Sequence, residues 1–265
     1  MGTRRAGAAV EIFSICLPKR TYKTARKQLK RLRRAAGEAR DWDVFLITLT
    51  EMARWRKSRR RAGFDFLTGY ALAQRTYAQI HLEEAGTDYP FAVDRFLANT
   101  ISDIEMSRDK NQPRRLLDLA APLLSSLLSN LELAAEADLS DYSRLHRVRI
   151  FGKRLRYAME VFADCFPPPF RTELYPDVEE MQDILGRAND SHVASQRLQA
   201  LRAKIQAVRP EDWNCLRPGI EGLLQFHEQR LPEERQRFLA WWRRWQQSGR
   251  RSALTAMLQG TDHNC

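Results

Sequence analysis

The sequence predicts an all-α protein built from two related antiparallel helical bundles of the four-helix type, and three observations carry this prediction. Apolar residues recur at helical spacing along almost the whole chain, and no segment shows the alternation or the β-branched density of a strand. The chain repeats itself at a constant offset, as Arg5 and Arg154 or Val44 and Val193 illustrate. Proline and glycine interrupt both copies at equivalent points, which predicts equal helix lengths.

The internal repeat has an offset of 149 residues, the difference between Arg5 and Arg154, and contains no gap. Chance matches between helices rich in Ala and Arg would not keep one register across a proline and a glycine break. We therefore expect two halves related by a pseudo-two-fold axis, with a basic groove on that axis. The predicted units are one domain over 1–265, with halves 1–138 and 139–258 and a tail at 259–265. The identical positions are Arg5, Ala9, Glu11, Phe13, Cys16, Pro18, Gly37, Ala39, Asp41 and Val44, matched by Arg154, Ala158, Glu160, Phe162, Cys165, Pro167, Gly186, Ala188, Asp190 and Val193.

The individual helices follow from the apolar spacing and from the residues that break it. The predicted helices span 3–16, 21–37, 41–61, 64–86, 90–106, 114–136, 141–165, 173–187, 190–208, 214–231 and 233–258. The predicted breaks lie at Pro18, Gly37, Gly63, Gly86, Pro90, Pro113, Pro167 to Pro169, Gly186, Pro210, Pro218 and Pro232. Asp41 and Asp190 each follow a glycine break by a few residues and are predicted helix N-caps.

The positive charge of the chain is concentrated near its N-terminus. The net charge is +11, and residues 1–40 hold twelve Lys or Arg against Glu11 and Glu38, which leaves +10 there and +1 for all other residues. A folded segment of this kind repels itself unless an anion neutralises it. We therefore expect a bound polyanion.

The composition also limits the class of protein. The four cysteines form no metal-binding spacing, so we expect no metal or cofactor, and buried thiols in a reducing cytoplasm. Glu11 interrupts the apolar stretch at the N-terminus and no small-residue cleavage site follows, which argues against a secretory signal. The most apolar tract, Leu116–Ala135, contains Asp118, Pro122 and Glu132, which argues against a membrane span.

The predicted helix 141–165 carries an apolar row and a row of cations. The apolar row consists of Leu145, Val148, Gly152, Leu155, Met159 and Phe162, and its spacing predicts contact with the core. The cationic row consists of His146, Arg149, Lys153 and Arg156. It follows the same spacing one residue later, about 100° around the helix. No acid interrupts the segment from 144 to 156, so anion binding is favoured over ordinary solvation or intrahelical pairing.

A second group of cations lies on the predicted helix 21–37. Lys27, Lys30 and Arg34 share one face of this helix. The equivalent segment of the second copy carries Asp177, Glu179, Glu180 and Asp183. Because the repeat is kept while its charge is reversed, these cations are not needed to build a bundle, and a role in anion binding is favoured.

Several of these segments resemble the CHAD domain family of α-helical domains. The run His146-x-x-Arg149-x-x-x-Lys153-Arg154-Leu155-Arg156-Tyr157 resembles the signature of the family's second repeat. The segment LKRLRRAAGEARDWDV at 29–44 resembles the one that follows its first-repeat helix, and Leu185-Gly186-x-x-Asn189-Asp190 extends the similarity to most of the chain. The resemblance implies two helical bundles related by a pseudo-two-fold axis, with a basic central cavity that binds inorganic polyphosphate.

The repeat extends the expected site into the first half. Arg4 and Arg5 take the positions of Lys153 and Arg154 and are predicted to share their role. The counterparts of the first two members of the cationic row would precede Met1, and we expect that a short native leader is missing from this sequence.

Two of the candidate residues have alternative interpretations. Arg40 resembles an arginine of the family's RDxDV segment, and either a ligand contact or a salt bridge to Asp43 would explain it. His146 is interpreted as a phosphate donor, a buried hydrogen-bonded histidine or, with least support, a general acid or base, because no nucleophile or carboxylate pair accompanies it.

The function predicted from these features is non-enzymatic binding of long-chain inorganic polyphosphate in the cytoplasm, where polyphosphate granules are the expected location. The predicted binding residues are Arg4, Arg5, Lys27, Lys30, Arg34, Arg40, His146, Arg149, Lys153 and Arg156. An alternative is RNA or DNA binding, because tryptophans lie beside arginines at Trp55 and at Trp241, Trp242 and Trp245, although the latter, with Phe238, share one helical face and are expected in the core. A phosphohydrolase has less support, since no carboxylate cluster for a divalent metal is present. No membrane partner is expected, and the oligomeric state is left open.

Overall fold

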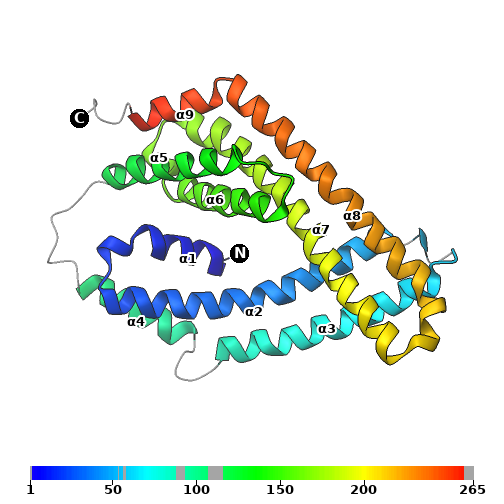
Figure 1. Ribbon diagram of the computed structural model, residues 1–265. Helices are drawn as coiled ribbons and strands as arrows, with labels where there is room; N and C mark the ends of the chain where they lie inside the picture. The colour runs from blue at the N-terminus through cyan, green and yellow to red at the C-terminus, as the bar shows by residue number, and fades with distance from the viewer. Residues whose placement is uncertain (1, 53, 56–57, 88–92, 107–115, 260–265) are drawn as a thin grey trace.

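The computed structural model describes residues 2–52, 54–55, 58–87, 93–106 and 116–259, without the side chains of 4, 16 and 93–96. Over these residues the chain forms nine α-helices and no strand, which confirms the all-α prediction (Figure 1). The helices are α1 Gly2–Ile12, α2 Lys19–Glu51, α3 Arg61–Thr87, α4 Val93–Met106, α5 Leu116–Ala135, α6 Tyr142–Val161, α7 Tyr175–Val208, α8 Pro210–Gln247 and α9 Arg250–Gln259. Short turns connect some of them, namely the 3₁₀ turns Ser14–Cys16 and Ala163–Cys165 and the π-helical turn Phe170–Leu174.

The helices α2 and α7 are longer than predicted because neither breaks at its glycine. They continue through Gly37 and Gly186, so the predicted breaks at these residues are wrong. Asp41 and Asp190 consequently lie inside helices, and their prediction as N-caps is also wrong. A glycine inside a helix costs only about 1 kcal/mol relative to alanine, and the buried apolar residues on both sides of each glycine outweigh that cost.

The helix α8 also differs from the prediction. It continues through Pro218 and Pro232, although a proline inside a helix removes one hydrogen bond and costs about 3 kcal/mol. Its end is set instead by Gly249, whose φ of 74° lies in the left-handed region that glycine adopts without strain. The single predicted helix 233–258 is therefore divided between α8 and α9.

Two hydrophobic cores are tied together by the long helices α7 and α8. The aromatic core lies among α5, α6, α9, the first half of α7 and the second half of α8, with Phe162 and Phe238 fully buried. The distal core lies among the second half of α2, α3, the second half of α7 and the first half of α8, around Phe64 and Ile220. Each core therefore combines helices from both of the sequence halves that were predicted (Figure 1).

Several details of core packing agree with the sequence. The whole apolar row of α6 is buried, and so are the four aromatic residues that share one face of α8. The 3₁₀ turns that follow α1 and α6 begin at Ser14 and Ala163, which differ by the offset of the repeat, 149 residues. Phe13 and Phe162 occupy equivalent repeat positions, and their rings contact each other edge to face with centroids 6.1 Å apart.

The apolar helix α5 belongs to the core. By length and composition alone it is the one helix in the described ranges that could cross a membrane. One of its faces buries Leu124, Leu128 and Leu131 in the aromatic core, and Glu132 forms an ion pair with Arg251 of α9. α5 therefore packs against the aromatic core along one face and leaves residues such as Leu133 exposed.

The cysteines only partly follow the expectation of burial. Cys165 is half-buried, whereas Cys215 is exposed on α8, so the prediction is wrong for Cys215. The side chain of Cys16 and the whole of Cys265 lie outside the described residues.

Candidate functional site

The helix α6 presents the cationic row at the edge of the aromatic core. Its first turn is capped by Asp141, whose carboxylate accepts a hydrogen bond from the Ser143 amide at 2.9 Å. Because the apolar row is buried against its neighbours, the adjacent row is half-buried instead of fully solvated, as its place beside the core predicts. The two ends of the cationic row then have different surroundings.

Arg156, at one end of the row, is paired with groups of this chain. Its guanidinium donates to the Tyr175 hydroxyl at 3.1 Å and to the Glu179 carboxylate at 3.1 Å. The Arg156 side chain is 17% exposed. Nη1 of Arg156, which was predicted as a ligand residue, is therefore engaged by Tyr175 and Glu179 within the fold.

His146, at the other end, belongs to an aromatic and polar group. The Tyr142 hydroxyl donates to the Asn189 side-chain oxygen at 3.0 Å and lies 3.4 Å from Nδ1 of His146. The Tyr142 ring also stacks on His192, with centroids 3.5 Å apart. Burial lowers the pKa of His146, and the positive charges of Arg149 and Lys153 lower it further, which favours a neutral imidazole.

Arg149 faces a carboxyl that other arginines also approach. Burial raises the pKa of Asp190 on α7, while the positive charges of Arg149, Arg40 and Arg230 act in the opposite direction. These three arginines belong to α6, α2 and α8, so charges from three helices act on this carboxyl of α7. Arg40 does not pair with Asp43, because the Asp43 carboxylate accepts from Nε of Arg75 at 2.6 Å. Among the described residues, neither Arg40 nor Arg149 forms an ion pair within 4.0 Å.

A cavity of about 200 Å³ lies beside this point, between α2, α7 and α8. Four arginines and three acidic residues line it, and Arg197 pairs with Asp41 at 3.4 Å. The arginines are Arg40, Arg187, Arg197 and Arg230, and the acidic residues are Asp41, Glu51 and Asp190. We call it the arginine cavity. Its floor contains Ser191 and His227, both almost fully buried, and Nε2 of His227 has no hydrogen-bond partner in the described structure. Burial lowers the pKa of His227 to about 4.

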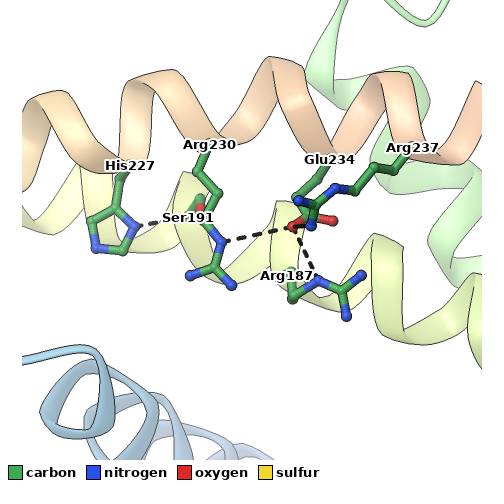
Figure 2. Close-up of polar contacts among 6 residues, drawn as sticks. All are labelled: Arg187, Ser191, His227, Arg230, Glu234 and Arg237. Atoms are coloured by element: carbon green, nitrogen blue, oxygen red, sulfur yellow. Dashed lines mark hydrogen bonds and ion pairs between the residues drawn. The ribbon is translucent and has the colours of Figure 1, made fainter. Parts of the chain in front are cut away.

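Two arginines of the cavity are held in place by a buried carboxylate (Figure 2). Glu234 is 1% exposed, and its Oε1 accepts from Nε of Arg187 at 3.0 Å and from Nη1 of Arg237 at 2.9 Å. Nε of Arg230 lies 3.8 Å from the same oxygen. Glu234 therefore fixes the guanidinium groups of Arg187 and Arg230 beside the arginine cavity.

The other predicted cations of the first half lie elsewhere. Lys27, Lys30 and Arg34 line a shallow groove of about 440 Å³ between α2 and α3, separate from the arginine cavity. Arg5 forms an ion pair with Glu160 of α6 at 2.6 Å and remains 61% exposed. The side chain of Arg4 lies outside the described residues.

The sequence did not single out Arg187, Arg197 or Arg230. They follow no cationic periodicity, and only the packing of α7 and α8 against α2 brings them to Arg40. Arg187 directly follows the Leu185-Gly186 pair, which is the only signal that could have indicated it. In the described part of the chain, no group of three or more His, Cys, Asp or Glu side chains could hold a metal ion.

Known proteins share this architecture. The model of the CHAD domain family matches residues 1–199. A crystal structure of the CHAD domain from the plant Ricinus communis is similar, with a TM-score of 0.61 and 24% sequence identity over 83% of this chain and 78% of that chain. At this identity the similarity concerns the fold alone. A search of the curated proteins finds no match. Because the family match extends over more than half of the chain, the protein belongs to the CHAD domain family.

Proposed function

We propose that this protein binds inorganic polyphosphate, without catalysing its turnover, where α2, α6, α7 and α8 converge on Asp190. The observation that carries the proposal is that Arg40 lines the arginine cavity together with Asp190, and that neither Arg40 nor Arg149 forms an ion pair within 4.0 Å with a described residue. Burial favours the neutral form of Asp190, so this carboxyl balances the nearby cations only poorly. The remaining positive charge favours an external anion, and guanidinium groups match the oxygens of phosphate.

The placement of these groups suits a chain of phosphates. Arg149 and Lys153 are one helical turn apart on α6, and Arg40 lies in the arginine cavity on α2. Arg40 lies on α2, the same helix that carries the groove of Lys27, Lys30 and Arg34. We infer that a flexible polyphosphate follows these cations along the groove between the two pseudo-symmetric halves, in the cytoplasm.

The tryptophans favour polyphosphate over single-stranded nucleic acid. Stacking of bases requires exposed aromatic faces. Trp241, Trp242 and Trp245 are buried in the aromatic core, and Trp55 is 5% exposed beneath the guanidinium of Arg60. These residues therefore offer no stacking surface, whereas phosphate binding needs only the cations.

A competition experiment tests the proposal. The protein would be titrated against a fluorescently labelled long-chain polyphosphate, with unlabelled polyphosphate, RNA and DNA as competitors at one salt concentration. We expect polyphosphate to displace the probe at a far lower phosphate concentration than either nucleic acid. Equal displacement by RNA would contradict the assignment, and release of phosphate in the presence of Mg²⁺ or Mn²⁺ would contradict a purely binding role.

A further inference from the structure

The outward side of α3 carries no charge over about three turns. We define the outer α3 face by its exposed residues Gly69, Leu72, Ala73, Thr76, Tyr77 and Ile80. Its three large members are about half exposed, Leu72 at 53%, Tyr77 at 57% and Ile80 at 49%. Charged residues make up 29% of the chain, so an exposed helical face of this length without any charge requires an explanation.

The residues of this face are arranged symmetrically about the centre of the helix. Gly69 and Ile80 lie equally far from the midpoint between positions 74 and 75, and so do Ala73 and Thr76. In an antiparallel pair of identical helices, residues equidistant from the two-fold axis lie at the same level. Ile80 of each copy would therefore face Gly69 of the other. The small Ala73 and Thr76 would occupy the centre, where the two helices come closest.

The packing of the single chain gives no reason for a glycine at position 69. A Cβ atom added to Gly69 would meet nothing within 4 Å, as is also true of Gly37 in α2 and Gly186 in α7. A glycine inside a helix is less stable than alanine by about 1 kcal/mol, so the isolated fold would gain from a larger residue here. A second helix packed closely over Gly69 would account for the absence of a side chain.

The charges at the two ends of α3 are opposite. Arg59 and Arg61 are exposed at its start, and Glu83 and Glu84 are exposed near its end. An antiparallel second copy brings the basic end of one helix beside the acidic end of the other. Asp65 is the exception near the basic end, and Arg61 already pairs with it at 3.5 Å.

We propose that the outer α3 face binds a second copy of this chain in an antiparallel, two-fold symmetric dimer. One helix pair buries less than the roughly 1,600 Å² of a standard protein interface, so the dimer is weak, with a dissociation constant of roughly 10 to 100 μM. The arginine cavity is lined by α2, α7 and α8, so the dimer leaves it open.

Sedimentation velocity over a concentration series tests the dimer. The variant Ala73→Glu places two like charges at the centre of the interface, and we expect it to weaken dimerisation at least tenfold. Leu133→Glu is the matched control, because Leu133 is 73% exposed on α5, away from this face, and its variant should dimerise like the wild type. Circular dichroism would establish that both variants are folded.

Exchanging the sizes of the side chains at positions 69 and 80 tests how the two copies are oriented. Gly69→Leu should clash with Ile80 of the second copy and weaken the dimer at least tenfold, while the thermal stability of the monomer stays equal or rises. The double variant Gly69→Leu with Ile80→Ala should restore part of the affinity, because the large residue then faces a small one. A wild-type chain that remains monomeric at about 300 μM, or a dimer that neither Ala73→Glu nor Gly69→Leu weakens, would overturn the proposal.

Discussion

Two arginine clusters on α7 and α8 differ in how their charge is balanced. Around Glu234, the buried carboxylate accepts hydrogen bonds from Arg187 and Arg237, and we call this group the closed cluster. Around Asp190, burial raises the pKa of the carboxyl, and Arg40 and Arg149 approach it without an ion pair to a described residue. The first cluster supplies its own counterion and stabilises the fold. The second retains positive charge that an external phosphate would neutralise.

The largest expected effect is on the cluster around Asp190, which we call the open cluster. Arg149→Glu with Lys153→Glu changes the local charge by four units, and we expect polyphosphate affinity to fall on the order of a thousandfold, about 4 kcal/mol. Fluorescence polarisation at fixed salt would measure it. Arg209→Glu with Arg217→Glu makes the same charge change at exposed positions near the start of α8, and its affinity should fall far less.

The folding of this variant is checked separately. Its thermal unfolding should remain close to that of the wild type, because neither side chain belongs to the buried core and both are only half-buried. An unchanged affinity in the folded double variant would reject the assignment of these two residues. Leu155→Asp is a contrasting variant that should unfold the chain, because Leu155 is fully buried.

A change in the closed cluster should lower the stability of the protein and leave its affinity for polyphosphate largely unchanged. Glu234→Gln leaves the guanidinium groups of Arg187 and Arg237 without their buried counterion, and we expect the free energy of unfolding to fall by roughly 2 to 3 kcal/mol. Urea denaturation would measure the loss. A variant as stable as the wild type would show that Glu234 does not hold this cluster together.

The smallest effect concerns the pH dependence of binding. The raised pKa of Asp190 means that it ionises at higher pH than an exposed aspartate, and ionisation adds a negative charge beside Arg40 and Arg149. Affinity should therefore rise as pH falls through the pKa of Asp190. Asp190→Asn should bind several-fold more tightly at neutral pH and with a flatter pH profile. A steeper profile in this variant would contradict the role given to Asp190.

Local sequence patterns predicted which faces of the helices are buried in the core. The apolar row of α6 and the aromatic face of α8 were predicted correctly because periodicity alone determines which side of a helix is buried. The helix lengths were not predicted correctly. Tertiary packing allows α2 to continue past Gly37 and α8 to continue past Pro218 and Pro232. A single sequence gives no measure of that compensation.

The candidate site was predictable only along one helix at a time. The spacing of the cationic row placed Arg149 and Arg156 together, yet Glu179 pairs with Arg156 and not with Arg149. That distinction depends on the register between α6 and α7, which is set by side-chain packing over many residues. The contribution of Arg187 and Arg230 depends in the same way on how α7 and α8 cross α2.

The most direct test of the central claim is a crystal structure of the protein with a short-chain polyphosphate bound. We predict phosphate density against Arg149 and Lys153 of α6 that continues to Arg40 and the arginine cavity, while Arg156 keeps its contact with Glu179. Phosphates bound solely on outward surfaces, with this convergence of four helices left empty at saturating ligand, would contradict the account.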